Sequence, residues 1–172
     1  MICYAVIDTN VLVSALISKN DVAATVQLYG RLVRGEIIPV YSKESLNEYR
    51  EVLSRKKFSL DVGLINRTLS TIEKRGIMIE PSPTGAILPD MKDLPFYEIV
   101  MEKRDDDAYL VTGNLKHFPK EPFIVTPRQM LDILDKNKAF EKIENLDLNF
   151  PKDFDVDAEL REALEEKYGH IG

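Results

Sequence analysis

The sequence has few cysteines and no long hydrophobic run. Among its 172 residues there is one cysteine, Cys3, and no tryptophan. A single cysteine excludes an internal disulfide framework, and its place in the apolar run 2–7 is typical of a small core residue. No stretch approaches the roughly 20 apolar residues that cross a bilayer. No basic segment or small-residue cleavage site accompanies the first apolar run, so we expect no signal peptide, no membrane partner and a cytoplasmic location.

The excess of negative charge is concentrated near the C-terminus. The net charge is −6, and residues 137–172 carry five basic and ten acidic side chains. Residues 1–136 carry 18 basic and 19 acidic side chains. The body of the chain is therefore nearly neutral, and the overall charge does not exclude a nucleic-acid partner.

Short apolar segments alternate with segments of helical periodicity. The apolar segments are 2–7, 37–41, 77–79, 108–112 and 123–125. One of the helical stripes consists of Val22, Val26, Tyr29 and Val33. Such alternation predicts a three-layer α/β/α fold with a central, mainly parallel five-stranded sheet. Pro39 cannot donate to a ladder, which favours an edge position or irregular geometry for the second strand.

The C-terminal part of the sequence differs from the rest. We predict one domain over residues 1–136 and an acidic extension over 137–172 that contains a short amphipathic helix. The helix is expected near 157–168, where Leu160 and Leu164 belong to a narrow apolar stripe. Such a helix is marginal alone. It either docks on its own domain, on a second protomer or on another partner, or is disordered.

Acidic and polar side chains gather where the predicted strands end. They are Asp8, Glu44, Glu48, Glu51, Asp90, Asp93 and Asn114. The carboxyl ends of parallel strands meet at one rim of a sheet, so these side chains can converge there. Carboxylates that meet repel one another unless a cation lies between them. Oxygen ligands without a nearby histidine or cysteine select a hard ion, Mg²⁺ or Mn²⁺.

Several of these residues also fit a structural role. The glutamates at 44, 48 and 51 can form a solvated helix face, and Asp93 can act as the N-cap of a helix over 94–103. The acidic run 105–107 is typical of a solvated turn. A loop with Lys116, His117 and Lys120 is either plain surface or a set of contacts to an RNA backbone.

Three blocks of the sequence are VIDTNVLVSAL (6–16), SKESLNEYREVL (42–53) and YLVTGNLKHFP (109–119). These blocks resemble PIN-domain ribonucleases, and within that family the VapC-like toxin components of toxin–antitoxin systems. They occur in the order and spacing of that family, and the resemblance runs from about residue 2 to 136. It implies a PIN-like fold for the first domain.

The resemblance also implies a metal centre. Asp8 corresponds to the first metal-binding acid, Glu48 to the second and Asp93 to the third, with Asp90 as a close competitor. The family often has a fourth aspartate where this chain has Asn114, whose amide oxygen can still bind Mg²⁺ or hold a water.

Supporting polar groups and partners follow from the same resemblance. Thr9, Asn10 and Thr112 would orient Asp8 or a bound water. The implied activity is Mg²⁺- or Mn²⁺-dependent cleavage of single-stranded RNA, and the implied partners are RNA, a cognate antitoxin protein and a second copy of the chain as a homodimer.

Two other classes of function stay open at this point. One is a non-catalytic PIN-like module that binds RNA or protein, which Asn114 favours. The other is a phosphatase with an aspartyl nucleophile, which also begins with a strand and an aspartate. Such phosphatases need a second aspartate two residues further on, where this chain has Asn10.

Overall fold

The computed structural model describes residues 3–144. Its centre is a sheet of five parallel strands in the order β3-β2-β1-β4-β5. The strands are β1 (Tyr4–Ile7), β2 (Ile38–Tyr41), β3 (Ile77–Met78), β4 (Tyr109–Val111) and β5 (Ile124–Val125). The predicted five-stranded sheet is therefore confirmed. The helix expected near 157–168 lies outside the described residues.

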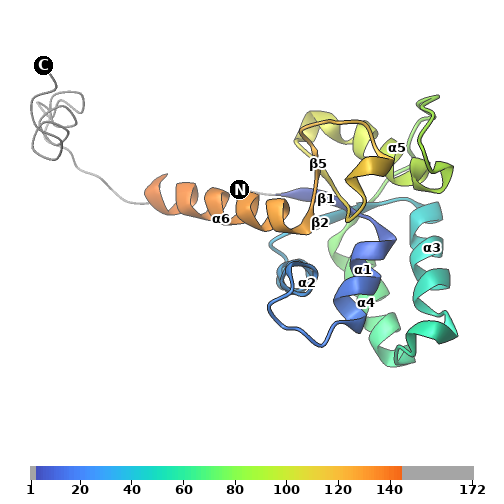
Figure 1. Ribbon diagram of the computed structural model, residues 1–172. Coiled ribbons are helices and arrows are strands. Elements are labelled where there is room, and N and C mark those ends of the chain that lie inside the picture. Colours follow the sequence, from blue (N-terminus) through green and yellow to red (C-terminus); the bar gives the residue numbers. More distant parts are fainter. Residues whose placement is uncertain (1–2, 145–172) are drawn as a thin grey trace, which may run out of the picture. The chain divides into compact units, whose positions relative to one another are not determined.

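Helices alternate with these strands and flank the sheet, which makes the three-layer α/β/α fold (Figure 1). The α-helices are α1 (Thr9–Ile17), α2 (Ala24–Arg34), α3 (Lys43–Leu53), α4 (Val62–Arg75), α5 (Leu94–Glu102) and α6 (Pro127–Glu144). Helix α5 packs on β1, β2 and β4, whereas α1 contacts α2 and α3, and α3 contacts α4. Single 3₁₀ turns complete the described part: η1 (Lys56–Phe58), η2 (Met91–Asp93), η3 (Arg104–Asp106) and η4 (Leu115–His117).

Strand β1 occupies the middle of the sheet. Ala5 and Val6 are completely buried, as expected for a parallel strand covered on both faces. Strands β2 and β4 lie on opposite sides of β1, because the order of the strands reverses there. The crevice between β1 and β4 is therefore the topological switch point of the sheet. Ile7 pairs with Val111, and the residues that follow these two strands therefore lie side by side.

Strand β2 is not at an edge of the sheet, because it lies between β1 and β3. The edge position inferred from Pro39 is therefore wrong. The backbone N–H of Ile38 donates to the carbonyl oxygen of Cys3 at 2.9 Å. Successive residues of a strand direct their backbone groups to alternate neighbours, so the backbone nitrogen of Pro39 is directed toward β3. The ladder to β3 begins only at Val40, and the missing N–H of Pro39 thus falls just before it.

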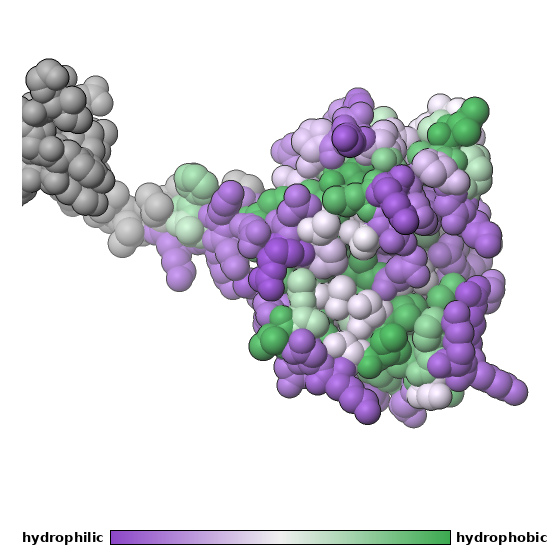
Figure 2. Space-filling model, in the orientation of Figure 1, coloured by the Kyte–Doolittle hydropathy of each residue, from purple (hydrophilic) through white to green (hydrophobic). Residues whose placement is uncertain are grey.

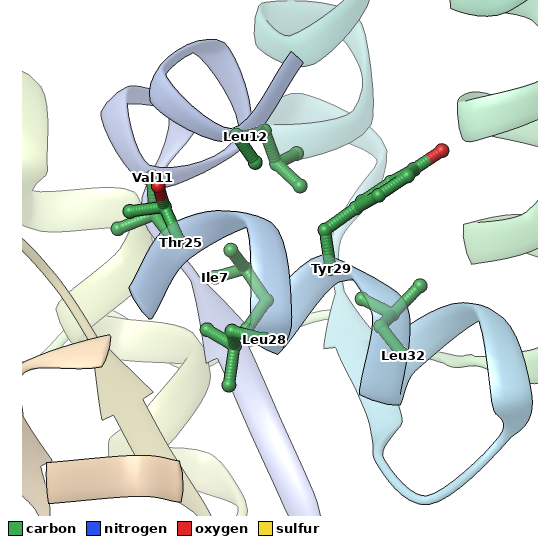
Figure 3. A pocket seen from close by; sticks show the side chains of 8 residues that line it. Ile7, Val11, Leu12, Thr25, Leu28, Tyr29 and Leu32 are labelled. Carbon is green, nitrogen blue, oxygen red and sulfur yellow. The ribbon is translucent and has the colours of Figure 1, made fainter. Parts of the chain in front are cut away.

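The buried face of α2 differs from the predicted stripe. Val22 precedes the helix and is 70% exposed, and Val33 is 41% exposed. Leu28 and Leu32 are the buried residues instead. Figure 3 shows them beside a small apolar hollow together with Ile7 of β1 and with Val11 and Leu12 of α1.

Polar groups hold several helix ends. Ser42 and Ser45 cap the start of α3 reciprocally, and Thr126 and Gln129 do the same for α6. Helix α2 ends at Gly35, whose φ of 80° is the left-handed conformation that glycine adopts freely. On the face shown in Figure 2, hydrophilic side chains cover most of the described residues, with hydrophobic ones in patches between them. Within residues 3–144, no helix is long and apolar enough to cross a membrane.

Gly76 is a test of how tightly α4 and β2 approach each other. A Cβ at this position would lie 2.5 Å from the backbone oxygen of Ile72 and 2.6 Å from that of Pro39. The backbone must shift to make room, so we expect Gly76→Ala to lower the free energy of unfolding by about 1–3 kcal/mol. Gly113→Ala is the control, because a Cβ there meets no atom within 4 Å. Urea denaturation measures both variants, and equal losses would contradict the tight approach.

Candidate active site

Asp8 lies at the carboxyl end of β1 and is the N-cap of α1. Its Oδ1 accepts a hydrogen bond from the backbone N–H of Asn10 at 3.0 Å. Its Oδ2 accepts one from the Thr112 hydroxyl, which follows β4, at 2.7 Å. Asp8 as a whole is only 2% exposed. The carboxylate is therefore held from both sides in the crevice between β1 and β4.

Helix α3 brings Glu48 to the same rim. The hydroxyl of Thr9 donates to Glu48 Oε1 at 2.6 Å. The next residue, Tyr49, is buried and donates its hydroxyl to the carbonyl oxygen of Ile7, one residue before Asp8. This bond pins α3 against the end of β1 and so places Glu48 close to Asp8.

The other two glutamates of α3 lie elsewhere. Glu44 and Glu51 are exposed, and Glu51 forms an ion pair with Arg55 at 3.1 Å. The solvated-face interpretation thus holds for these two residues. Glu48 is half-buried and bonded to Thr9, so it does not share their environment.

Asp93 and Asp90 lie in the segment that leads into α5. Asp93 occupies the N-cap position, but its side chain makes no capping hydrogen bond. Its Oδ2 instead contacts His117 Nδ1 at 2.8 Å. Asp90 accepts a hydrogen bond from the backbone N–H of Lys92 at 3.0 Å and so caps the turn η2. Asp93 thus occupies the predicted N-cap position of α5 without capping the helix, and Asp90 caps only the turn before it. Asp93 is 9% exposed, and its carboxylate faces the rim.

Burial and neighbouring charges shift the pKa of two acids at the rim, Asp8 and Glu48. Burial raises the pKa of Asp8, the negative charge of Asp93 raises it further, and the bonds from Thr112 and Asn10 lower it. Burial also raises the pKa of Glu48, as do the charges of Asp8 and Asp93. Three carboxylates thus share one poorly solvated region. A divalent cation would relieve their repulsion, and oxygen-rich sets of this kind fit Mg²⁺ or Mn²⁺.

The loop after β4 contributes the remaining predicted residues. Asn114 donates its backbone N–H to the Thr112 hydroxyl at 2.9 Å, which fixes the start of η4 beside the site. Lys116 and Lys120 are exposed on the rim of a surface hollow whose other lining includes Leu115, Phe118 and Pro119.

His117 is the residue whose place sequence reasoning missed. The expected ligand set had no nearby histidine, but the imidazole lies against Asp93. One ligand atom each from Asp90, Asp93 and His117 lie within 4.8 Å of one another. No sequence motif indicates this contact, because the turn η4 that brings it about has no signal of its own.

Comparison with protein families agrees with this arrangement. The family model of the PIN domain matches residues 4–116, which include every acid of the rim. The chain therefore belongs to the PIN-domain family, whose members are generally metal-dependent nucleases. The match favours the nuclease interpretation over the aspartyl phosphatase. Comparisons with curated proteins and with solved structures found no significant match.

The burial of Asp8 makes a testable link between pH and stability. Its pKa is raised above the ordinary value of 3.8, so the folded protein holds this proton more tightly than the unfolded chain does. The free energy of unfolding of the metal-free protein therefore falls as the pH rises from about 4 through the raised pKa. Asp8→Asn removes this loss, and we expect it to be more stable than the wild type at pH 7 in a chelator, with a difference that shrinks toward pH 4. Urea denaturation across that range measures it. A less stable variant at pH 7 would mean that the bonds to the carboxylate outweigh its desolvation.

Proposed function

We propose that the protein is an endoribonuclease that hydrolyses phosphodiester bonds of single-stranded RNA and requires Mg²⁺ or Mn²⁺. The observation that carries the proposal is the nearly inaccessible Asp8 at the β1–β4 crevice, where the charge of Asp93 raises the pKa of Asp8 and the charges of Asp8 and Asp93 raise the pKa of Glu48. Such a cluster is unfavourable without a cation and useful with one. When bound, the ion would supply activation of a water and stabilise the charge on the departing oxygen.

The proposal assigns a task to each side chain of the rim. Asp8, Glu48 and Asp93 hold the cation, with Asp90 and Asn114 as further oxygen ligands. Thr112 and the backbone of Asn10 orient Asp8, and Thr9 orients Glu48. The Thr112 hydroxyl is already engaged with Asp8, so the chain itself supplies no nucleophile from this position. The attacking group in this proposal is a water.

The substrate interpretation rests on the surroundings of the rim. Lys116 and Lys120 are exposed on the loop that carries His117, and they are available to contact phosphates of an RNA strand. Sequence-specific proteins bind RNA mainly where the bases are unpaired. The finer assignment, a VapC-like toxin with a cognate antitoxin protein, rests on the three sequence blocks that resemble that group.

Replacement of the acids tests the proposed activity. We expect Asp8→Asn and Glu48→Gln each to lower Mg²⁺- or Mn²⁺-dependent cleavage of single-stranded RNA by at least about a hundredfold, because each change removes a charged ligand. Glu44→Gln is the matched control, since Glu44 lies on the same helix and is exposed. Cleavage is measured on a labelled RNA, with and without a chelator. Activity that survives both variants would refute the metal assignment.

A second function would account for a protein that does not cleave RNA. Asn114 stands where the family often has an acid, which favours a non-catalytic PIN-like module that binds RNA or protein. Wild-type protein that binds RNA but cuts none with either metal would support that alternative. Metal-dependent cleavage of RNA by the wild-type protein therefore distinguishes the two functions.

Self-association is the last part of the proposal and involves residues beyond the described range. We propose a homodimer that uses the apolar stripe at Leu160 and Leu164. A chain ending at Glu144 keeps Met130 and Leu134 of α6, which are buried in the core. We expect the full chain to have the mass of a dimer in solution and the shortened chain that of a monomer, as measured by light scattering. A monomeric mass for both would contradict the proposal.

A further inference from the structure

The structure assembles one nitrogen and two carboxylates at the edge of the proposed centre. Asp90 and Asp93 come from the segment before α5, and His117 comes from η4 after β4. One ligand atom from each residue lies within 4.8 Å of the other two. Ligand atoms around one octahedral ion lie about 3 to 4 Å apart. The three ligand atoms are thus only slightly farther apart than the ligands of one ion.

The bonds of these residues leave ligand atoms for an ion. Asp90 uses Oδ1 to accept from Lys92, and Asp93 uses Oδ2 in its contact with His117. Within the described part of the chain, the second oxygen of each carboxylate is not engaged by these bonds. The imidazole contacts Asp93 through Nδ1 at 2.8 Å, a spacing close to that of neighbouring ligands of one ion, so Nδ1 is the nitrogen that can bind an ion together with Asp93.

We propose that Asp90, Asp93 and His117 form a binding site for a divalent transition-metal ion, in which the imidazole makes the protein select Mn²⁺ over Mg²⁺. The reason is the nature of the ligands. Mg²⁺ takes oxygen ligands almost exclusively, whereas Mn²⁺, as a transition-metal ion, accepts an imidazole nitrogen more readily than Mg²⁺ does. Oxygen ligands alone would bind both ions, so the nitrogen is the part of the site that discriminates.

The inference rests on the proposed cation site but not on RNA cleavage. The sequence pattern implied oxygen ligands only, and the added nitrogen comes from the η4 turn. A simpler role for His117 would be to hold Asp93 in place through its Nδ1. Both roles lower metal affinity when His117 is removed, but only direct binding of the nitrogen changes the preference between Mn²⁺ and Mg²⁺.

His117→Asn separates these roles, because the asparagine amide can replace the Nδ1–H donor toward Asp93 but has no imidazole. Calorimetric titration of the full chain with each metal alone gives the affinities. We expect the variant to lose Mn²⁺ affinity by about tenfold or more and Mg²⁺ affinity by less than about threefold. Leu115→Ala, in the same turn, is the control and should leave both affinities unchanged.

A measurement on unchanged protein makes the test independent of how the variant folds. Pulsed electron paramagnetic resonance of the Mn²⁺ complex detects a directly bound nitrogen, and we expect that coupling in the wild type. Absence of the coupling, absence of Mn²⁺ binding, or equal losses of both metals in His117→Asn would each overturn the inference. Protein that shows the nitrogen coupling but cuts no RNA would support it while refuting the proposed nuclease.

Discussion

The hydrogen bond from Thr112 to Asp8 is the interaction on which the rim of this sheet depends. It joins the residues that follow β1 and β4, and the register of Ile7 with Val111 brings them together. A carboxylate in so dry a place is costly unless its oxygens accept hydrogen bonds, and here Thr112 and the backbone of Asn10 each serve one. The sheet therefore determines both where the charge lies and which way it points.

A buried aromatic pair extends this control to the other two acids. Tyr49 bonds to the carbonyl of Ile7 and packs against Phe96, with ring centroids 5.9 Å apart. Tyr49 follows Glu48 directly on α3, and Phe96 lies on α5 three residues after Asp93. The core contact thus sets the spacing of α3 and α5, and with it the separation of two carboxylates. Packing and proposed chemistry use the same elements.

The sequence was informative where the signal is local and uninformative where the contact is distant. The uncharged run 2–7 was one of the predicted strands, and it forms the buried strand β1. Charge and spacing alone do not distinguish the three glutamates of α3. The resemblance singled out Glu48, and in the folded helix Glu48 is the one that is half-buried and bonded to Thr9. Pro39 was misleading because its missing donor falls just before the ladder of β3.

His117 belongs to the site although no sequence motif indicates its contact with Asp93. Its partner Asp93 is 24 residues away, and the contact depends on a single 3₁₀ turn set by the bond from Asn114 to Thr112. Thr112 therefore does two things at once: it donates to Asp8 and accepts from the backbone that starts η4. Through this one hydroxyl, the position of the first acid and that of the imidazole are coupled. A cation bound by both Asp8 and His117 would stabilise the folded state, because it binds that state and not the unfolded chain. It would also offset the cost of gathering buried carboxylates at the centre of the sheet.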